Sequence, residues 1–192
     1  MKRNIIFDIG GIFLDDKNRK ITEKYGINID EQKRIMSEIS FRECLLGNIR
    51  VKDYIEKFRN TEYYEFAKES LSPENYRNSL PPIQEIIDLI PKLEEYNLYL
   101  LSNNILESSK YFYGFVPEKY FQGHIFSFEE HLVKPDPEIY ELLLDRYNLV
   151  AEECIFFDDK KRNTEAAEKL GIESMTVDSP GVILEYFGNK NE

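Results

Sequence analysis

Short apolar runs that end in polar residues restrict the fold of this chain more than any other feature of its sequence. The first run, Ile5–Phe7, is followed by Asp8 and then by the pair Gly10-Gly11. A buried strand ends in this way where the backbone must come close to a ligand, because glycine has no side chain to block the approach. Ligands of an open parallel sheet bind beyond the carboxyl ends of its strands, so Asp8 is expected at a binding site. The alternative is that Asp8 only ends the strand and stabilises a turn.

Four similar runs follow Pro82 and alternate with segments of helical periodicity. The predicted strands are Leu98–Leu101, Gly123–Ser127, Cys154–Phe157 and Ser174–Val177. The predicted helices are Ile83–Tyr96, Pro137–Tyr147, Thr164–Leu170 and Val182–Phe187. Short right-handed crossovers place neighbouring strands side by side and parallel. The sequence therefore predicts an α/β protein with a doubly wound, mostly parallel sheet.

Residues 17–80 lack this alternation and carry apolar residues at helical spacing. The predicted helices of this segment are Ile21–Tyr25, Asp30–Ser40, Val51–Arg59 and Glu62–Leu71, with Asp30 as an N-cap. The pair Pro81-Pro82 is the predicted boundary, because its fixed backbone angles stiffen the chain. We therefore predict a core formed by residues 1–16 and 81–192, with a small all-helical domain, residues 17–80, inserted after the first strand.

Composition and charge limit the partners of this chain. It has 36 acidic and 25 basic residues and a net charge of -11, which disfavours nucleic acid and anionic membranes because both would repel it. No apolar run has membrane-spanning length and the N-terminus lacks a secretory segment, so a cytoplasmic location is expected. Cys44 and Cys154 follow no metal-binding spacing and are expected to be reduced packing residues. Monomer and homodimer both stay open.

The polar residues at the strand ends are expected to meet at one edge of the sheet. Besides Asp8, they are Ser102 and the pair Asp158-Asp159, and Lys134 in a proline-flanked loop can reach the same edge. Three carboxylates brought together raise each other's pKa unless a cation neutralises them, and a set of oxygen ligands selects Mg²⁺. A lysine and a hydroxyl beside Mg²⁺ indicate that the ligand is a phosphate.

In this order and context, the same residues resemble the four motifs of the haloacid dehalogenase-like superfamily. The resemblance covers essentially the whole chain, and residues 17–80 resemble the helical cap of its first subclass. The motif segments are Phe7–Gly11, Leu101–Asn104, Val133–Pro137 and Phe156–Asp159, and they are most similar to a branch of sugar-phosphate phosphatases typified by glucose-1-phosphate phosphatases. The resemblance implies a Mg²⁺-dependent phosphatase that acts on a small phosphorylated metabolite, with sugar phosphates among the candidates.

The resemblance also implies a metal site that includes the nucleophile. Asp8 would attack phosphorus to form an aspartyl-phosphate, which splits a difficult hydrolysis into two displacements. Asp8 would also bind Mg²⁺, together with the backbone carbonyl of Gly10 and the carboxylate of Asp159. Asp158 would be a neighbour of these ligands or an indirect ligand through water.

The resemblance further implies that three residues bind the phosphate. Ser102 and the amide of Asn103 would hold a phosphoryl oxygen. Lys134 would offset the negative charges of the nucleophile and the phosphate. The corresponding alternatives are an ordinary turn residue for Ser102 and a solvated loop lysine for Lys134.

Two positions depart from the pattern of the superfamily. Gly10 replaces the usual second Asp of the first motif, a general acid-base group worth about 10²–10⁴-fold in rate, although the sugar-phosphate branch also has glycine there. Asn163 stands where an acid often completes the fourth motif, which lowers the local negative charge. Two other functions therefore stay open: a binding or regulatory protein derived from a phosphatase, and a metal-free dehalogenase-type hydrolase. The pair Asp158-Asp159 argues against the second, because uncompensated carboxylates beside a carboxylate nucleophile are costly.

Overall fold

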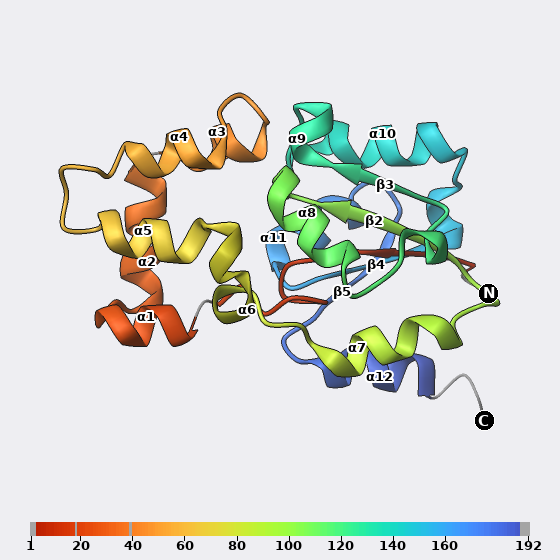
Figure 1. Cartoon of the computed structure of the whole chain (residues 1–192). Helices are drawn as coiled ribbons and strands as arrows, with labels where there is room; N and C mark the ends of the chain where they lie inside the picture. The colour runs from red at the N-terminus through yellow and green to blue at the C-terminus, as the bar shows by residue number, and fades with distance from the viewer. Residues whose placement is uncertain (1–2, 18, 39, 189–192) are drawn as a thin grey trace.

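A sheet of five parallel strands forms the centre of the protein, in the order β3-β2-β1-β4-β5 (Figure 1). The structure is a computed structural model that describes residues 3–17, 19–38 and 40–188. Its strands are β1 (Asn4–Phe7), β2 (Asn97–Ser102), β3 (Gly123–Phe126), β4 (Cys154–Asp158) and β5 (Glu173–Thr176). The predicted α/β fold with a parallel sheet is therefore confirmed.

The central strand β1 is buried on both faces, as a strand covered by helices on each side must be. Ile5 and Phe7 belong to the apolar cluster on one face, whereas Ile6 belongs to the cluster on the other face. Phe7 lies beside Leu100 of β2 and Phe157 of β4 in the sheet register. This register places Asp8 between the carboxyl ends of β2 and β4.

Helices cover both faces of the sheet. One face packs against α7 (Gln84–Leu89), α8 (Leu106–Tyr113) and α12 (Pro180–Gly188), and the other packs against α10 (Pro137–Tyr147) and α11 (Lys161–Glu168). The short helix α9 (Ser127–Glu130) follows β3, and η3 (Glu118–Tyr120) and η4 (Ala151–Glu153) are single 3₁₀ turns. The predicted helix Ile83–Tyr96 was too long, because α7 ends at Leu89 and is followed by the 3₁₀ turn η2 (Ile90–Lys92), which contains Pro91. The sequence patterns did not predict α8 or α9.

From Arg19 to Ser79 the regular elements of the described chain are short helices joined by turns, and we call residues 19–79 the helical insert. Its elements are α1 (Arg19–Tyr25), α2 (Ile29–Glu38), α3 (Arg42–Leu45), α4 (Val51–Glu56), α5 (Tyr64–Leu71), η1 (Pro73–Asn75) and α6 (Tyr76–Ser79). The backbone N–H of Glu31 donates to Asn28 Oδ1 at 2.9 Å, so Asn28 caps α2 and the predicted cap Asp30 lies within its first turn.

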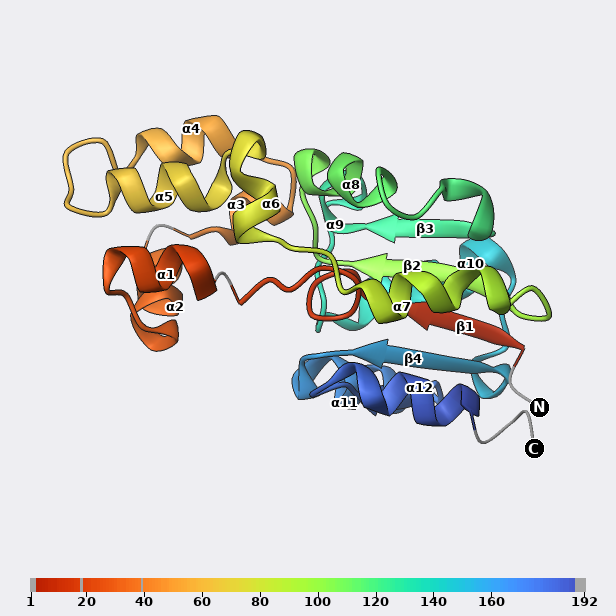
Figure 2. The same cartoon turned by 60° about the horizontal axis from the view of Figure 1, so that its bottom comes forward.

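The helical insert lies beyond the carboxyl ends of the strands (Figure 2). It has its own apolar cluster around Tyr54, Phe58 and Phe66, which includes the buried, free Cys44. Its two connections to the sheet run side by side, because the backbone N–H of Asp15 donates to the carbonyl of Pro81 at 2.9 Å. These features support our proposal that residues 17–80 form a separate cap domain with its boundary at Pro81-Pro82.

Candidate active site

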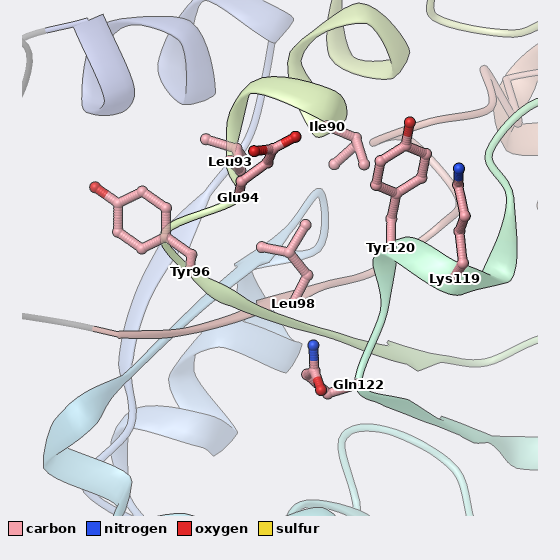
Figure 3. A pocket seen from close by; sticks show the side chains of 8 residues that line it. All are labelled: Ile90, Leu93, Glu94, Tyr96, Leu98, Lys119, Tyr120 and Gln122. Carbon is pink, nitrogen blue, oxygen red and sulfur yellow. The ribbon is translucent and has the colours of Figure 1, made fainter.

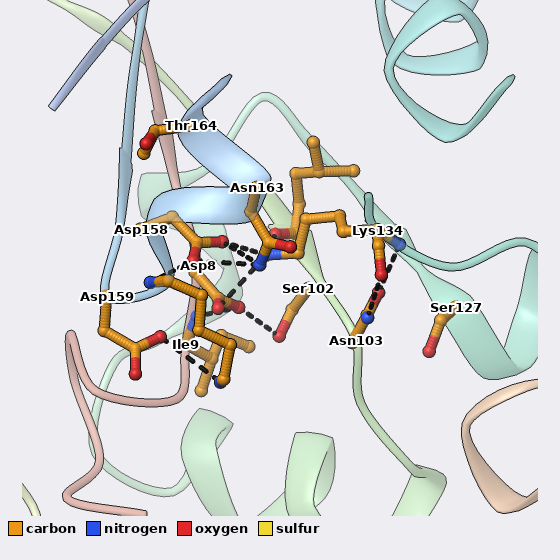
Figure 4. A network of polar contacts seen from close by, with 12 residues as sticks. Asp8, Ile9, Ser102, Asn103, Ser127, Lys134, Asp158, Asp159, Asn163 and Thr164 are labelled. Atoms are coloured by element: carbon orange, nitrogen blue, oxygen red, sulfur yellow. Dashed lines mark hydrogen bonds and ion pairs between the residues drawn. The ribbon is translucent and has the colours of Figure 1, made fainter. Parts of the chain in front are cut away.

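Four residues from distant parts of the chain meet at the carboxyl ends of β1, β2 and β4 (Figure 4). The Ser102 hydroxyl donates to Asp8 Oδ1 at 2.7 Å. Lys134 Nζ lies 3.1 Å from Asp8 Oδ2 and 2.6 Å from Asp158 Oδ2. All four side chains are buried, so these charged contacts are made away from bulk water. The convergence that the strand order predicts is therefore present in the structure.

Lys134 is held in place by both its backbone and its side chain. Its Nζ also donates to the carbonyl of Leu101 at 2.7 Å. Its backbone N–H donates to Asn103 Oδ1 at 2.8 Å, and Asn103 Nδ2 donates to its carbonyl at 2.8 Å. The Asn103 side chain thus positions the loop that carries Lys134, and a contact of the Asn103 backbone amide with phosphate stays a prediction.

Asp158 is surrounded by donors from the protein itself. Its Oδ1 accepts from the backbone N–H of Lys160 at 2.8 Å, and Asn163 Nδ2 lies 2.9 Å from each of its oxygens. Burial alone would raise the pKa of Asp158, but the ion pair with Lys134 and these hydrogen bonds hold it below its ordinary value. A carboxylate with this many donors is suited to fixing Lys134, and less suited to binding a metal directly.

Asn163 orients Asp158, and this contact gives a test of the substituted fourth motif. Replacing Asn163 with Asp is expected to lower the free energy of unfolding by about 1–3 kcal/mol, because an amide donor is exchanged for a second buried carboxylate. Urea unfolding without Mg²⁺ measures the change. Asn60→Asp, at an exposed turn position beyond the end of α4, is the matched control. A variant as stable as the wild type would contradict this role of Asn163.

Asp159 faces a second set of charges, formed by Lys160 and Asp16. Lys160 Nζ lies 3.3 Å from Asp159 Oδ1 and 3.6 Å from Asp16 Oδ2. Burial opposes its charge, but the carboxylates around it, with Asp16 the strongest, raise the pKa of Lys160 above its ordinary value. Gly11 allows the approach of Asp159, because its φ is +73° and a Cβ there would lie 2.6 Å from the Asp159 Cβ. The sequence patterns did not identify Asp16 and Lys160 as parts of the site. The signal that could have identified them is their closeness in the sequence to the first and fourth motifs.

The three carboxylates of Asp8, Asp158 and Asp159 form a cluster that fits a divalent cation. Each offers one oxygen, and these oxygens lie within 4.8 Å of one another. Burial raises the pKa of Asp8 to about 7 and also raises the pKa of Asp159. The nearby lysines therefore neutralise the negative charges of these two carboxylates only in part. A cluster of oxygen donors suits Mg²⁺ better than zinc.

The sequence profile of a family described as haloacid dehalogenase-like hydrolase matches residues 5–177. This chain belongs to that family. Membership makes the protein a haloacid dehalogenase-like hydrolase and confirms the resemblance seen in the motifs.

This haloacid dehalogenase-like hydrolase matches most of one curated relative and only a small part of another. It is 30% identical over 180 residues to the phosphorylated carbohydrates phosphatase of Thermotoga maritima, covering 88% of this chain and 82% of that protein. It is 31% identical over 143 residues to acyl-CoA dehydrogenase family member 10 of Mus musculus, covering 70% of this chain and 13% of that protein.

Solved structures share the fold of this haloacid dehalogenase-like hydrolase. One is a family enzyme of Bacteroides thetaiotaomicron in complex with magnesium and inorganic phosphate, with a TM-score of 0.70, 24% identity, and coverage of 92% of this chain and 94% of that chain. Another is the L-2-haloacid dehalogenase of Xanthobacter autotrophicus with chloropropionic acid covalently bound, with a TM-score of 0.64, 16% identity, and coverage of 91% and 76%. Within the described residues, no helix is long and apolar enough to span a membrane.

Two hollows of the surface lie at opposite ends of the sheet. One, of about 450 Å³, lies between the helical insert and the core and is lined by Arg50, Glu107 and Phe128 among others. The other, of about 230 Å³, is lined by Leu98 near the start of β2 and by Gln122 just before β3 (Figure 3). The second hollow is therefore remote from Asp8, whereas the first adjoins the loop that follows Ser102.

Proposed function

We propose that this hydrolase is a Mg²⁺-dependent phosphomonoesterase with Asp8 as its nucleophile. The observation that carries the proposal is the convergence of Ser102 and Lys134 on Asp8, which is itself a member of the carboxylate cluster. A hydroxyl and an ammonium beside a carboxylate suit a tetrahedral dianion that must approach a negatively charged nucleophile. Bound Mg²⁺ would supply further positive charge for the phosphoryl oxygens.

The proposed reaction consists of two displacements at phosphorus. A carboxylate oxygen of Asp8 forms a bond to phosphorus as the bond to the ester oxygen breaks, and the departing alkoxide takes a proton from water, because Gly10 offers no acid. Water then attacks the phosphorus of the aspartyl-phosphate, which releases inorganic phosphate and restores Asp8. Ser102 would hold a phosphoryl oxygen, while Lys134 would neutralise charge that builds up between nucleophile and phosphate.

The proposed metal ligands are Asp8, Asp159 and the backbone carbonyl of Gly10. Asp158 would act through water, because its oxygens already accept from Lys134, Lys160 and Asn163. In this arrangement Asp158 fixes the lysine, and Asp159, whose side chain is 18% exposed, is the more accessible member of the pair.

The proposed substrate is a small phosphorylated metabolite, with a sugar phosphate as the leading candidate. The name of the Thermotoga maritima relative supports this class. The hollow of about 450 Å³ between the helical insert and the core is the proposed site of the non-phosphate part of such a substrate. Two contacts join the helical insert to the loop that carries Lys134. Arg42 of the insert forms an ion pair with Asp136 at 2.7 Å, and His131 Nδ1 lies 2.6 Å from the carbonyl oxygen of Leu46.

A screen of phosphorylated metabolites tests the proposal. We expect release of inorganic phosphate that requires Mg²⁺, is lost on addition of EDTA, and is faster for sugar phosphates than for other phosphomonoesters. Absence of phosphate release from all substrates would favour a binding or regulatory function. Metal-independent release of halide from 2-haloacids would favour the dehalogenase alternative.

The missing acid of the first motif gives a second prediction. Gly10→Asp is expected to raise kcat by up to about 10²-fold on esters with poor leaving groups, and less on activated aryl phosphates, because a proton donor helps most where the leaving alkoxide is basic. A Cβ at Gly10 would lie 2.9 Å from Asp16 Oδ2, the mobile end of a side chain that can rotate away.

The control for this prediction is Gly10→Asn, which has the same size and no acidic proton. Steady-state rates on a series of phosphate esters with leaving groups of graded pKa measure the effect. Equal changes on all esters, or the same gain with Asn, would contradict the account of the missing acid.

A further inference from the structure

Lys160 lies against the carboxylate cluster, and the reaction proposed above assigns it no step. Its ammonium is 3.3 Å from Asp159 Oδ1 and 3.6 Å from Asp16 Oδ2. Its backbone N–H is fixed to Asp158 Oδ1 at 2.8 Å, but its side chain is 41% exposed. The main chain of Lys160 is therefore anchored at the cluster, while its partly exposed side chain has room to rotate between the two carboxylates that its ammonium contacts.

Two lysines divide the three carboxylates of the cluster between them. Lys134, whose side chain is fully buried, contacts Asp8 and Asp158. Lys160 contacts the remaining member, Asp159. Carboxylates at this spacing repel each other unless a cation lies close by, so Lys160 supplies to Asp159 the charge that Lys134 supplies to the other two.

We propose that the ammonium of Lys160 is a built-in counter-ion of Asp159 that Mg²⁺ must displace, and that Asp16 receives the ammonium when Mg²⁺ binds. The inference rests on the metal site of the proposed function. Two cations on one carboxylate repel each other strongly, and the lysine side chain is the one that can rotate away. A small rotation of the exposed Lys160 side chain keeps its ion pair with Asp16, which is already 3.6 Å away.

The proposal gives Lys160 two opposed effects. Before Mg²⁺ binds, the ammonium lowers the repulsion among the carboxylates and stabilises the folded site. When Mg²⁺ arrives, the same ammonium competes for Asp159 and lowers the affinity for the metal. The apparent affinity therefore depends on how well Asp16 holds the displaced lysine.

Titration of Mg²⁺ into this 192-residue chain without substrate, followed by calorimetry, tests the inference. Lys160→Met is expected to bind Mg²⁺ about tenfold more tightly than the wild type, because the competing charge is removed and the apolar stem is kept. Lys161→Met is the matched control, because that lysine is 78% exposed and pairs with Glu165 along α11. It is expected to change the affinity by less than about twofold.

Two further variants separate competition from other effects of charge. Lys160→Arg keeps the cation and is expected to retain the wild-type affinity. Asp16→Asn is expected to weaken Mg²⁺ binding more in the wild type than in the Lys160→Met background, because only the former must relocate an ammonium.

Unchanged or weaker Mg²⁺ binding by Lys160→Met would overturn the inference, as would an equal gain with Lys161→Met or Lys160→Arg. Equal effects of Asp16→Asn in the two backgrounds would overturn the role of Asp16. Because no turnover is measured, the affinity change is expected even if the protein hydrolyses no phosphate ester. An active Mg²⁺-dependent phosphatase without the affinity change would refute this inference alone.

Discussion

Replacing Asp8 with asparagine is expected to reduce phosphate release by at least about 10³-fold, equivalent to about 4 kcal/mol in the activation barrier. Asparagine keeps the size of the side chain, but its amide oxygen is neutral and a poor nucleophile. The stability of the protein is expected to stay equal or to rise, because burial raises the pKa of Asp8 to about 7 and its charge is therefore unfavourable in this position. Loss of activity with retained stability would separate chemistry from folding.

Steady-state phosphate release and urea unfolding of the same preparations measure the two effects of Asp8→Asn. Asp15→Asn is the control, because Asp15 is in the same loop and its Oδ1 accepts from the backbone N–H of Lys17. A direct assay reduces the acid-quenched enzyme with borohydride, which converts an acyl phosphate at Asp8 to homoserine. Hydrolysis by Asp8→Asn at more than a tenth of the wild-type rate would remove Asp8 from the mechanism.

The meeting of Asp8, Ser102 and Asp158 was predictable because it depends on topology alone. In a parallel sheet, the residues that end neighbouring strands lie at one edge, and here β2 and β4 flank β1. Apolar runs and their polar ends can be recognised locally, so the five strands could be placed to within about two residues. The proline-flanked setting of Lys134 indicated the loop, although its full burial is visible only in the structure.

The roles of Asn103, Lys160 and Asp16 could not be predicted, because they depend on where side chains point after a strand has ended. The Asn103 side chain turns toward the backbone of Lys134, which is 31 residues away. Asp16 reaches Lys160 from the other end of the chain, and no local pattern encodes that pair. Helices α8 and α9 were missed because serine and aromatic residues interrupt their helical pattern.

Lys134→Met is expected to lower the free energy of unfolding by about 3–5 kcal/mol, besides abolishing activity. The side chain is fully buried, and its removal leaves Asp8 and Asp158 without the cation that both contact. It also leaves the carbonyl of Leu101 without its donor. Methionine fills a similar volume, so loss of packing contributes little to the change.

Urea unfolding of Lys134→Met, with Lys161→Met as the exposed control, measures the loss of stability. If the loss comes from uncompensated charge, adding Asp8→Asn to Lys134→Met is expected to restore part of the stability, because one of the two unpaired carboxylates is then removed. Mg²⁺ is expected to raise the unfolding midpoint of Lys134→Met more than that of the wild type, since the metal neutralises the same carboxylates. A loss below about 1 kcal/mol, or a double variant less stable than the sum of the single changes predicts, would show that Lys134 does not hold this cluster together.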